Sequence, residues 1–323
     1  MLICRLLLRI QALVRIRSIG IALLLVALAG VGAEPARCSQ GTVTLAAVGD
    51  VFFCRGVAQQ MERHGLDYPF EFVADILSRY DLGFCNLECT FSTRGTAQNK
   101  RFLFRADPST AHLLSTAGFE VISLANNHTL DFGPLALLDT VQAVEDAGMM
   151  PVGTHLSGSD DPSITVVERN GLRIGFLALS DFNVAYDEAP EGYPVDQYPV
   201  INHVDIDRLP QQVADAKGMC DTLVVSVHWG IDYISLWTER QRLIAQTCID
   251  NGADLVLGHH PHVLQDVVTY EGKTIVYSIG AFVWDSTLAE ADKSAIFVFE
   301  LSRGGAVLVE TIPVRIVDCR PIP

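Results

Sequence analysis

The stretch Ala253-Asp254-Leu255-Val256-Leu257-Gly258-His259-His260-Pro261-His262 joins an apolar run to three histidines within four residues. The run predicts a buried strand, and the residues after it place several imidazoles at the carboxyl end of that strand. Open α/β sheets bind ligands at this edge, and neutral imidazole binds metals such as Zn, Mn, Fe or Ni. Histidines can also merely end a strand. Because three of the nine histidines of the chain lie here, we interpret the stretch as half of a metal site.

The rest of the chain alternates strand-like apolar runs with helix-like amphipathic stretches, a pattern typical of layered α/β proteins. Strands are predicted at residues 42–48, 82–87, 120–125, 164–168, 172–179, 222–227, 254–258, 274–278, 295–301 and 306–312, and helices at 70–79, 108–117, 134–147 and 238–251. Asn170-Gly171 predicts a tight hairpin between two of these strands. The β-rich end of the chain is expected to form a second sheet packed face to face on the first. The polar segment 181–205 is predicted to be a long loop.

Five of the predicted strands are followed directly by side chains that can bind metal. They are Asp50, Glu88, the run Asn126-Asn127-His128, His228, and the cluster of His259, His260 and His262. Each has an ordinary structural alternative, because Asp and Asn favour turns and a lone histidine more often packs in a core. Five such strand ends in one chain nevertheless predict that these side chains converge on one rim of the fold.

This set of ligands fits a hydrolytic site with two metal ions. Two cations about 4 Å apart can activate a bridging water and hold both oxygens of an in-line displacement. Glu88 ends a buried run, where a carboxylate needs a cation or hydrogen-bond donors to offset its desolvation. His128 is a candidate general acid, since Asp131 three residues later can orient it. Arg55 is either a solvated arginine or, near Asp50, a clamp for an anionic oxygen.

Residues 1–33 are predicted to be a secretory signal. Four arginines precede an uncharged apolar run over residues 19–33 that ends in small residues, the order typical of such signals. The run is shorter than the ~20 residues that span a bilayer, so cleavage is favoured and an uncleaved membrane anchor is the alternative. We therefore expect an exported protein, periplasmic or extracellular.

About 290 residues follow the predicted signal, enough for one large α/β domain, which we place at residues 42–318. The formal net charge is −15, and loss of a signal with four arginines and no acid makes it −19. Such acidity argues against binding to nucleic acid or to anionic lipid. Export permits disulfides. Cys220 with Cys248 and Cys38 with Cys319 are candidate pairs, although sequence alone does not assign the pairing.

Taken in order, these residues resemble the CapA family of capsule or poly-γ-glutamate synthesis proteins, which belongs to the calcineurin-like metallophosphatase superfamily. The matching stretches are Gly49-Asp50-Val51 with Arg55, Asn86-Leu87-Glu88, residues 124–128 with Asp131-Phe132-Gly133, His228-Trp229-Gly230, residues 258–262, and residues 277–282. They extend over about residues 42–286, and several of them are multi-residue and distinctive.

The resemblance implies a four-layer αββα sandwich of two mixed sheets, metallophosphatase-like, with helices outside and the site at a sheet edge. It also implies one or two divalent metal ions (Mn, Zn, Fe or similar) as cofactors and His128 as the acid. His259 is the alternative to His260, but alternation along an extended segment favours His260 with His262. Position by position, the implied metal ligands are Asp50, Glu88, Asn127, His228, His260 and His262.

Two positions depart from the family pattern. Metallophosphatases usually begin with an Asp-x-His pair, whereas Phe52 stands two residues after Asp50, so one metal loses a ligand. The CapA group shares this departure. The usual Ser-Leu-Gly-Asn-Phe reads Ser-Ile-Gly-Ala-Phe here, with Ala281 in place of an amide side chain. The number of bound metals, one or two, therefore stays open.

The combined interpretation is an exported, metal-dependent, phosphoesterase-like hydrolase of the CapA type that serves capsule or poly-γ-glutamate synthesis or export. Its expected partner is an anionic capsule polymer or its precursor, with membrane synthase subunits as further candidates and no nucleic acid. The alternative is an accessory protein that uses the same rim to hold polymer or synthase without catalysis. Hydrolysis of an amide bond in the polymer also stays open, because the ligands do not determine which bond is cleaved.

Overall fold

The computed structural model describes residues 41–159, 164–183, 198–285, 288 and 290–323. The predicted signal and Cys38 lie outside these residues, as does most of the predicted loop 181–205. Within the described ranges, every helix is too short or too polar to cross a bilayer. The last strand, at Arg320–Ile322, lies beyond the expected end of the domain at residue 318.

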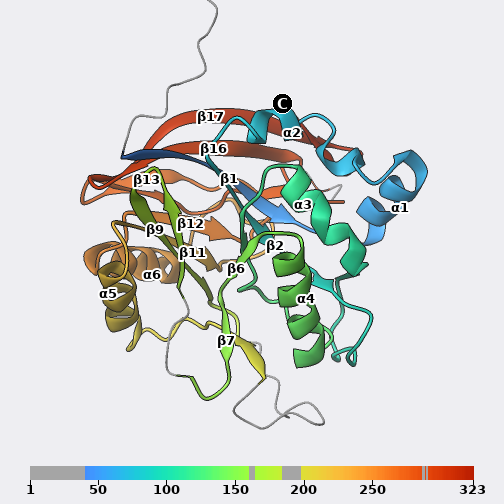
Figure 1. Ribbon diagram of the computed structural model, residues 1–323, viewed down its shortest axis with the longest axis horizontal. Coiled ribbons are helices and arrows are strands. Elements are labelled where there is room, and N and C mark those ends of the chain that lie inside the picture. The colour runs from blue at the N-terminus through green and yellow to red at the C-terminus, as the bar shows by residue number, and fades with distance from the viewer. Residues whose placement is uncertain (1–40, 160–163, 184–197, 286–287, 289) are drawn as a thin grey trace, which may run out of the picture. The chain divides into compact units, whose positions relative to one another are not determined.

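Two β-sheets form the centre of the protein (Figure 1). The first sheet has the strand order β18-β17-β16-β1-β2-β5-β6, with β15 beside the end of β1. Strands β1, β2, β5 and β6 are parallel, whereas β16, β17 and β18 are joined antiparallel. The strands are β1 (Thr42–Val51), β2 (Leu82–Leu87), β5 (Val121–Ser123), β6 (Met150–Val152), β15 (Ala281–Val283), β16 (Lys293–Ser302), β17 (Gly305–Val317) and β18 (Arg320–Ile322).

The second sheet has the strand order β13-β14-β12-β11-β9-β8 and is also mixed. Strands β9, β11, β12 and β14 are parallel, and β8 and β13 pair antiparallel at the two edges. The strands are β8 (Thr165–Arg169), β9 (Leu172–Ser180), β11 (Thr222–His228), β12 (Leu255–His259), β13 (Val267–Tyr270) and β14 (Lys273–Val276). Two short pairs complete the strands: β3 (Thr90–Phe91) with β4 (Arg105–Ala106), and β7 (Thr154–Leu156) with β10 (Pro199–Ile201).

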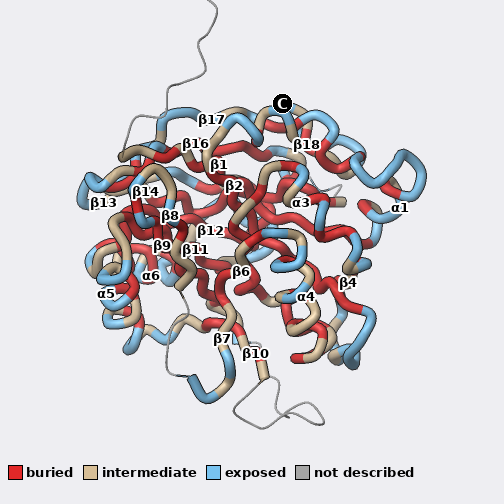
Figure 2. Tube along the Cα trace, viewed as in Figure 1, coloured by how far each residue is buried: buried red, intermediate tan, exposed pale blue. Residues whose placement is uncertain are grey.

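Helices cover the outer face of each sheet, so the predicted four-layer αββα sandwich is confirmed (Figure 1). The first sheet packs against α1 (Arg55–His64), α2 (Ala74–Leu77), α3 (His112–Thr116) and α4 (Pro134–Asp146), and the second against α5 (Leu209–Gly218) and α6 (Glu239–Asp250). Short 3-10 turns lie at η1 (Tyr68–Phe70) and η2 (Pro108–Ala111). Side chains such as Leu45, Phe84, Phe176 and Leu257 fill the space between the sheets, and Figure 2 shows the buried chain running through both.

Local sequence signals explain several of these boundaries. Thr238 begins α6 with a capping box, in which its side chain accepts from the Gln241 amide and the Gln241 side chain accepts from the Thr238 amide. Pro134 occupies the first turn of α4, where its missing N–H costs nothing. Asn170 and Gly171 both have positive φ, 54° and 77°, which matches the two-residue hairpin predicted between β8 and β9.

Two helix predictions for the early part of the chain differ from the structure. The helix predicted over residues 70–79 is wrong in extent, because only η1 and the single turn of α2 form there and Val73 leaves the helical region at φ −122°. Helix α1 was not predicted. It begins after Cys54 without a side-chain cap and without an acidic first turn, so the usual start signals are missing.

Three predictions for the later part of the chain are also wrong. The β-rich end does not form the second sheet, because β16 pairs antiparallel with β1 and extends the first sheet instead. Cys220 and Cys248 are both free thiols, so the bridge between them is not formed. Cys319 is free as well. The segment 181–205 is not all loop, since β10 forms within its described part.

Asp254 directly precedes β12, at the end of the second sheet opposite to the histidines, and links strands β11 and β14 to helix α5. Its carboxylate accepts hydrogen bonds from Lys217 Nζ (2.6 Å), Lys273 Nζ (2.6 Å) and the backbone amide of Leu223 (2.9 Å). Burial alone would raise the pKa of Asp254, but these donors outweigh it and hold the pKa below its usual value. The ionised carboxylate therefore stabilises the fold at neutral pH.

Replacing Asp254 with asparagine is expected to lower the free energy of unfolding at pH 7 by about 2–3 kcal/mol, because two lysines lose their anionic partner. Since the pKa is depressed in the folded state, this stabilisation is present above the unfolded pKa of about 3.9 and is lost as the pH falls further. Urea unfolding of wild type and variant should therefore differ at pH 7 and converge towards pH 3. The exposed Asp207→Asn serves as control. A constant difference over this range would contradict the assignment.

Candidate metal centre

Strand ends from both sheets meet at one site. Asp50 lies near the end of β1, Glu88 follows β2 and Asn127 follows β5, all in the first sheet. His228 ends β11 and His259 ends β12 in the second sheet. The side chains converge as expected, but the rim lies across the carboxyl ends of two sheets rather than along the edge of one.

Glu88 provides the strongest indication that this site binds a cation. Its side chain is fully buried, and neither carboxylate oxygen has a hydrogen-bond partner. Oε1 lies 3.7 Å from His228 Nε2, 3.9 Å from His262 Nε2 and 3.9 Å from His128 Nε2. These distances are too long for hydrogen bonds. They are close to the roughly 3.4 Å that separates two ligands of one tetrahedral cation when each ligand lies 2.0–2.2 Å from the ion.

The protonation states of the site also fit a divalent cation. Burial, and after it the charge of Asp50, raises the pKa of Glu88 well above its usual value. Burial lowers the pKa of His228 well below its usual value and that of His260 to about 3. Neutral imidazoles offer the free lone pairs that a metal requires, and a cation would stabilise the ionised form of the carboxylate. The residues present therefore fit such an ion.

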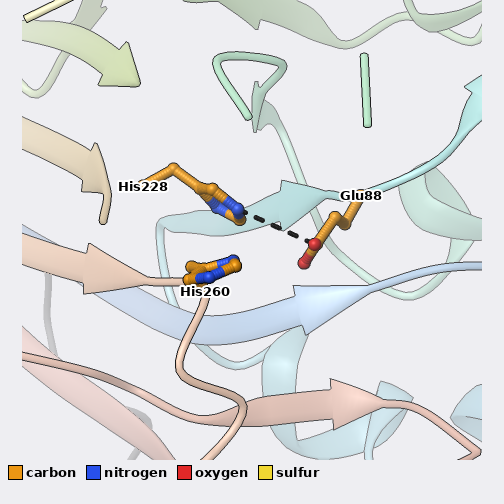
Figure 3. A group of neighbouring side chains, drawn as sticks. All are labelled: Glu88, His228 and His260. Atoms are coloured by element: carbon orange, nitrogen blue, oxygen red, sulfur yellow. Dashed lines mark ion pairs between the residues drawn. The ribbon is translucent and has the colours of Figure 1, made fainter. Parts of the chain in front are cut away.

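Three groups of described side chains bring possible ligand atoms within 4.8 Å of one another. They are Glu88-His228-His260, Asp50-Glu88-His262 and Asp232-His260-His262. Figure 3 shows the first group, in which Glu88 and His228 point toward one another and His260 comes from the segment after β12. Glu88 belongs to two groups, as expected of a carboxylate between two cations.

Asp50 orients His262 in addition to being a candidate ligand. Its Oδ2 accepts hydrogen bonds from His262 Nδ1 (2.9 Å) and from the backbone amide of His260 (3.2 Å), and Oδ1 accepts from Asn86 Nδ2 (2.9 Å). Burial alone would raise the pKa of Asp50, but the imidazoles of His259 and His262 outweigh it and hold the pKa well below its usual value. Donation from Nδ1 leaves Nε2 of His262 as a free acceptor beside Glu88.

His259 differs from the two histidines that follow it. Its ring is fully buried 5.9 Å from the ring of Phe84, and its Nδ1 lies 3.6 Å from Asp50 Oδ1. It belongs to none of the three groups. His260 and His262 are therefore better placed than His259 as candidate ligands. The reason is not the alternation of side chains along an extended segment, because these two residues have φ values of 95° and 55°. This positive-φ turn aims both rings at the site.

His228 lies between two amide side chains. Its Nε2 is 3.0 Å from Asn127 Oδ1, and its Nδ1 is 3.3 Å from Asn86 Nδ2. Asn126 supports this arrangement, because its Nδ2 donates to Asn86 Oδ1 (3.2 Å) and its Oδ1 accepts from the backbone amide of His128 (3.0 Å). Asn126 was predicted only as part of the run Asn126-Asn127-His128 after a strand, and Asn86 was not predicted as a site residue. A polar residue inside the fully buried strand β2 was the signal that could have identified Asn86.

His128 forms a buried dyad with Asp131. Its Nδ1 is 2.7 Å from Asp131 Oδ2, which also accepts from the Phe104 backbone amide (2.7 Å). Lys100, a residue the sequence analysis missed, donates to Asp131 Oδ1 and to the carbonyl of Asn127 (2.6 Å). Burial is the largest cause that lowers the pKa of His128. The dyad directs His128 Nε2 toward Glu88, as required of a proton-transfer group in the site.

A series of stacked rings packs beside the ligands. Trp284 stacks on His262 (4.1 Å between ring centroids) and on Phe52 (4.1 Å), and Phe104 stacks on His128 (3.9 Å). Phe52 therefore packs against the ring of Trp284, which in turn stacks on His262. Ala281, the second departure from the family pattern, is the register partner of Asp50 where β15 meets β1.

Arg55 lies outside this layer of rings, at the rim of the site. It pairs with Asp285 (3.1 Å), its side chain is 46% exposed, and its guanidinium carbon lies 5.6 Å from the ring centroid of Phe104. No hydrogen bond or ion pair joins it to Asp50 in the described part of the chain. The structure therefore places Arg55 where it can meet an anionic part of a ligand, but not as a direct partner of Asp50.

Comparison with known proteins finds a family and relatives that this chain resembles over most of its length. Residues 44–286 match the family described as "Bacterial capsule synthesis protein PGA_cap". The chain is 32% identical over 289 residues to the capsule biosynthesis protein CapA of Bacillus anthracis, covering 87% of this chain and 69% of that protein. It is 30% identical over 292 residues to the PGA biosynthesis protein CapA of Bacillus subtilis (strain 168), covering 88% and 74%.

A solved structure of a hypothetical protein from Thermus thermophilus has a similar fold. The TM-score is 0.51 and the sequence identity is 18%, over 84% of this chain and 97% of that chain. At this identity the likeness concerns the fold alone.

Proposed function

This chain belongs to the PGA_cap family of bacterial capsule synthesis proteins, and from this premise we propose that it serves capsule or poly-γ-glutamate synthesis as a metal-dependent hydrolase of the phosphoesterase type. One observation carries the proposal: the buried carboxylate of Glu88 has no hydrogen-bond partner and faces three imidazole nitrogens at 3.7–3.9 Å. A structural role alone gives no reason to keep such a carboxylate.

The residues that would hold divalent cations fall into two overlapping sets. Glu88, His228 and His260 form one set together with Asn127, and Asp50 and His262 form the other around the same Glu88. Both sets combine oxygen and imidazole ligands, which suit Mn, Zn or Fe. A cation bound there supplies Lewis-acid polarisation of an anionic oxygen and lowers the pKa of a water molecule.

The chain itself supplies the proton transfer and the orientation of the substrate. In its imidazolium form, His128 would give the Nε2 proton to the leaving oxygen and return to the neutral form, while Asp131 accepts from Nδ1–H and fixes the plane of the ring. Lys100 balances the charge of Asp131 and fixes the backbone at Asn127. Arg55 at the rim would bind an anionic group of the substrate away from the reacting atoms.

We further propose an anionic capsule polymer, or its precursor, as the substrate or partner. The protein carries a formal net charge of −15, so an anionic ligand needs local positive charge. The cations would provide most of it at the site, because Lys100 and Arg55 are already paired with Asp131 and Asp285. Membrane synthase subunits are further candidate partners. An extracytoplasmic location is proposed from the order of charged, apolar and small residues over 1–33.

A non-catalytic accessory role is the second candidate. The observation that favours it is Phe52, an apolar side chain that is fully buried where related enzymes place a ligand. A protein of this kind would use the same rim to hold polymer or a synthase. The dyad of His128 and Asp131 favours catalysis, because holding a polymer does not require a buried proton-transfer pair.

Metal removal tests the proposal directly. The purified protein is treated with EDTA, reloaded with Mn²⁺ or Zn²⁺, and assayed with bis-p-nitrophenyl phosphate and with poly-γ-glutamate. We expect hydrolysis of the phosphodiester to disappear with the chelator and to return with the metal. A metal-loaded protein that binds poly-γ-glutamate but hydrolyses neither compound would overturn the hydrolase in favour of the accessory role. Cleavage of poly-γ-glutamate alone would overturn the phosphoesterase type and identify an amide hydrolase.

A further inference from the structure

Asp232 is a carboxylate beside the site that lies two residues after the motif His228-Trp229-Gly230 and was not among the predicted site residues. It belongs to the segment between β11 and α6, four residues after His228. Its side chain is 59% exposed, yet Oδ1 lies 3.2 Å from His260 Nε2 and 3.8 Å from His262 Nε2. The second distance is nearly the same as the 3.9 Å between Glu88 Oε1 and His262 Nε2. Asp232 thus faces the same imidazole nitrogen of His262 as Glu88 does.

The backbone around Asp232 is held against the histidine segment. The amide of Tyr233 donates to the carbonyl of Pro261 (2.8 Å), and Gln265 Nε2 donates to the carbonyl of Ile234 (2.8 Å). Gly230 and Tyr233 both have positive φ, 86° and 59°, a conformation that a residue such as Tyr adopts only when its surroundings require it. The segment therefore has a defined position, and Asp232 is not a freely moving surface carboxylate.

The set of Asp50, Glu88 and His262 leaves room for a further ligand. It contains three side chains, whereas zinc sites take four ligands and manganese sites more; the other set already has Asn127 as its fourth member. Asp50 already accepts three hydrogen bonds, and Phe52 has no ligand atom to offer. Asp232 is partly solvated, so binding a cation there carries a smaller desolvation cost than at Glu88.

We propose that Asp232 is a ligand of the metal centre, binding the cation or cations held by His260 and His262. This inference rests on the proposed metal dependence of the site and adds a residue from the β11–α6 segment to it. In the structure, Asp232 contacts both histidines that follow β12. The segment thereby forms one wall of the centre on its solvent side.

The test compares the metal binding of Asp232→Asn with that of wild type in the full chain, by calorimetric titration with Mn²⁺ and Zn²⁺. Co²⁺ substitution adds a second readout, since its visible absorption reports the number of ligands whether or not the protein is active. Glu239→Gln is the matched control, because Glu239 begins the adjacent α6, is 77% exposed and pairs only with Arg242 in the described contacts. Asp232 is also exposed, so its substitution should leave the fold intact.

We expect Asp232→Asn to weaken metal binding at least tenfold or to lower the number of bound ions, and to change the Co²⁺ spectrum. Glu239→Gln should match wild type in both. If Asp232→Asn keeps the affinity, stoichiometry and spectrum of wild type while Glu88→Gln loses metal, Asp232 is not a ligand and the proposed function stands. If wild type itself binds no divalent cation, the proposed function and this inference both fail.

Discussion

Glu88→Gln is expected to stabilise the metal-free protein and to remove its response to divalent cations. In wild type the carboxylate is buried without a hydrogen-bond donor, and burial raises its pKa. Glutamine has nearly the same shape and no charge to desolvate. We expect a gain of about 1–3 kcal/mol in the free energy of unfolding in EDTA, the usual cost of an unsatisfied buried group. A cation that binds only the folded state adds about 2.7 kcal/mol to the free energy of unfolding when its concentration is a hundred times its Kd. The variant should not show this increase.

Thermal unfolding with EDTA and with a series of Mn²⁺ or Zn²⁺ concentrations measures both effects. The exposed Glu62→Gln is the control and should behave as wild type in both conditions. A Glu88→Gln protein whose melting temperature still rises with metal as in wild type would show that Glu88 is not a ligand. A variant that is less stable than wild type in EDTA would instead show that the carboxylate has a stabilising partner of its own.

His128→Ala is expected to lower hydrolysis by about 10²–10⁴-fold, the usual contribution of a positioned proton donor, without a change in metal content. The argument rests on the position of Nε2, which faces the site while Asp131 holds Nδ1. A proton donor matters most when the leaving group is a poor one. The loss should therefore be large for an alkyl phosphodiester and small for a p-nitrophenyl ester, whose leaving oxygen needs no proton.

Measuring kcat for both esters, with metal content determined on the same samples, separates proton transfer from a general loss of structure. The exposed His112→Ala serves as control and should leave both rates unchanged. An equal loss for the two esters would mean that His128 acts as a structural or metal-binding residue. Loss of metal together with activity would lead to the same conclusion.

The fold was largely predictable because its strands carry their own signals. Buried apolar runs such as β2 and β11 are continuous in the sequence, and the capping box at Thr238 and the proline at 134 mark where two helices begin. The pairing of strands that are distant in the sequence has no such local signal. The hairpin of β16 and β17 has a local turn, but nothing in its periodicity shows that β16 will pair with β1, which lies near the other end of the described chain.

The convergence of polar side chains was predictable where they lie at the end of a buried strand, as for Glu88 after β2 and His228 at the end of β11. It was not predictable where contacts depend on loop conformation. His260 and His262 were selected by an argument from extended backbone, although both residues have positive φ. Asp232 lies in a loop of mainly apolar and aromatic residues with no local pattern that predicts a ligand, and the hydrogen bond from the Tyr233 amide to the Pro261 carbonyl holds this loop against the histidine segment.

The two sheets, each with its covering helices, provide different kinds of candidate ligand at the rim. In the two groups that contain Glu88, both buried carboxylates (Asp50 and Glu88 itself) come from the first sheet, and His228, His260 and His262 come from the second. Both of these groups draw on the two sheets, so an ion bound between them would cross-link the sheets. Metal binding would then require that the two sheets are packed against each other as in the native fold. Removal of the metal by a chelator would weaken the contact between the sheets at the rim before it affects the outer helices.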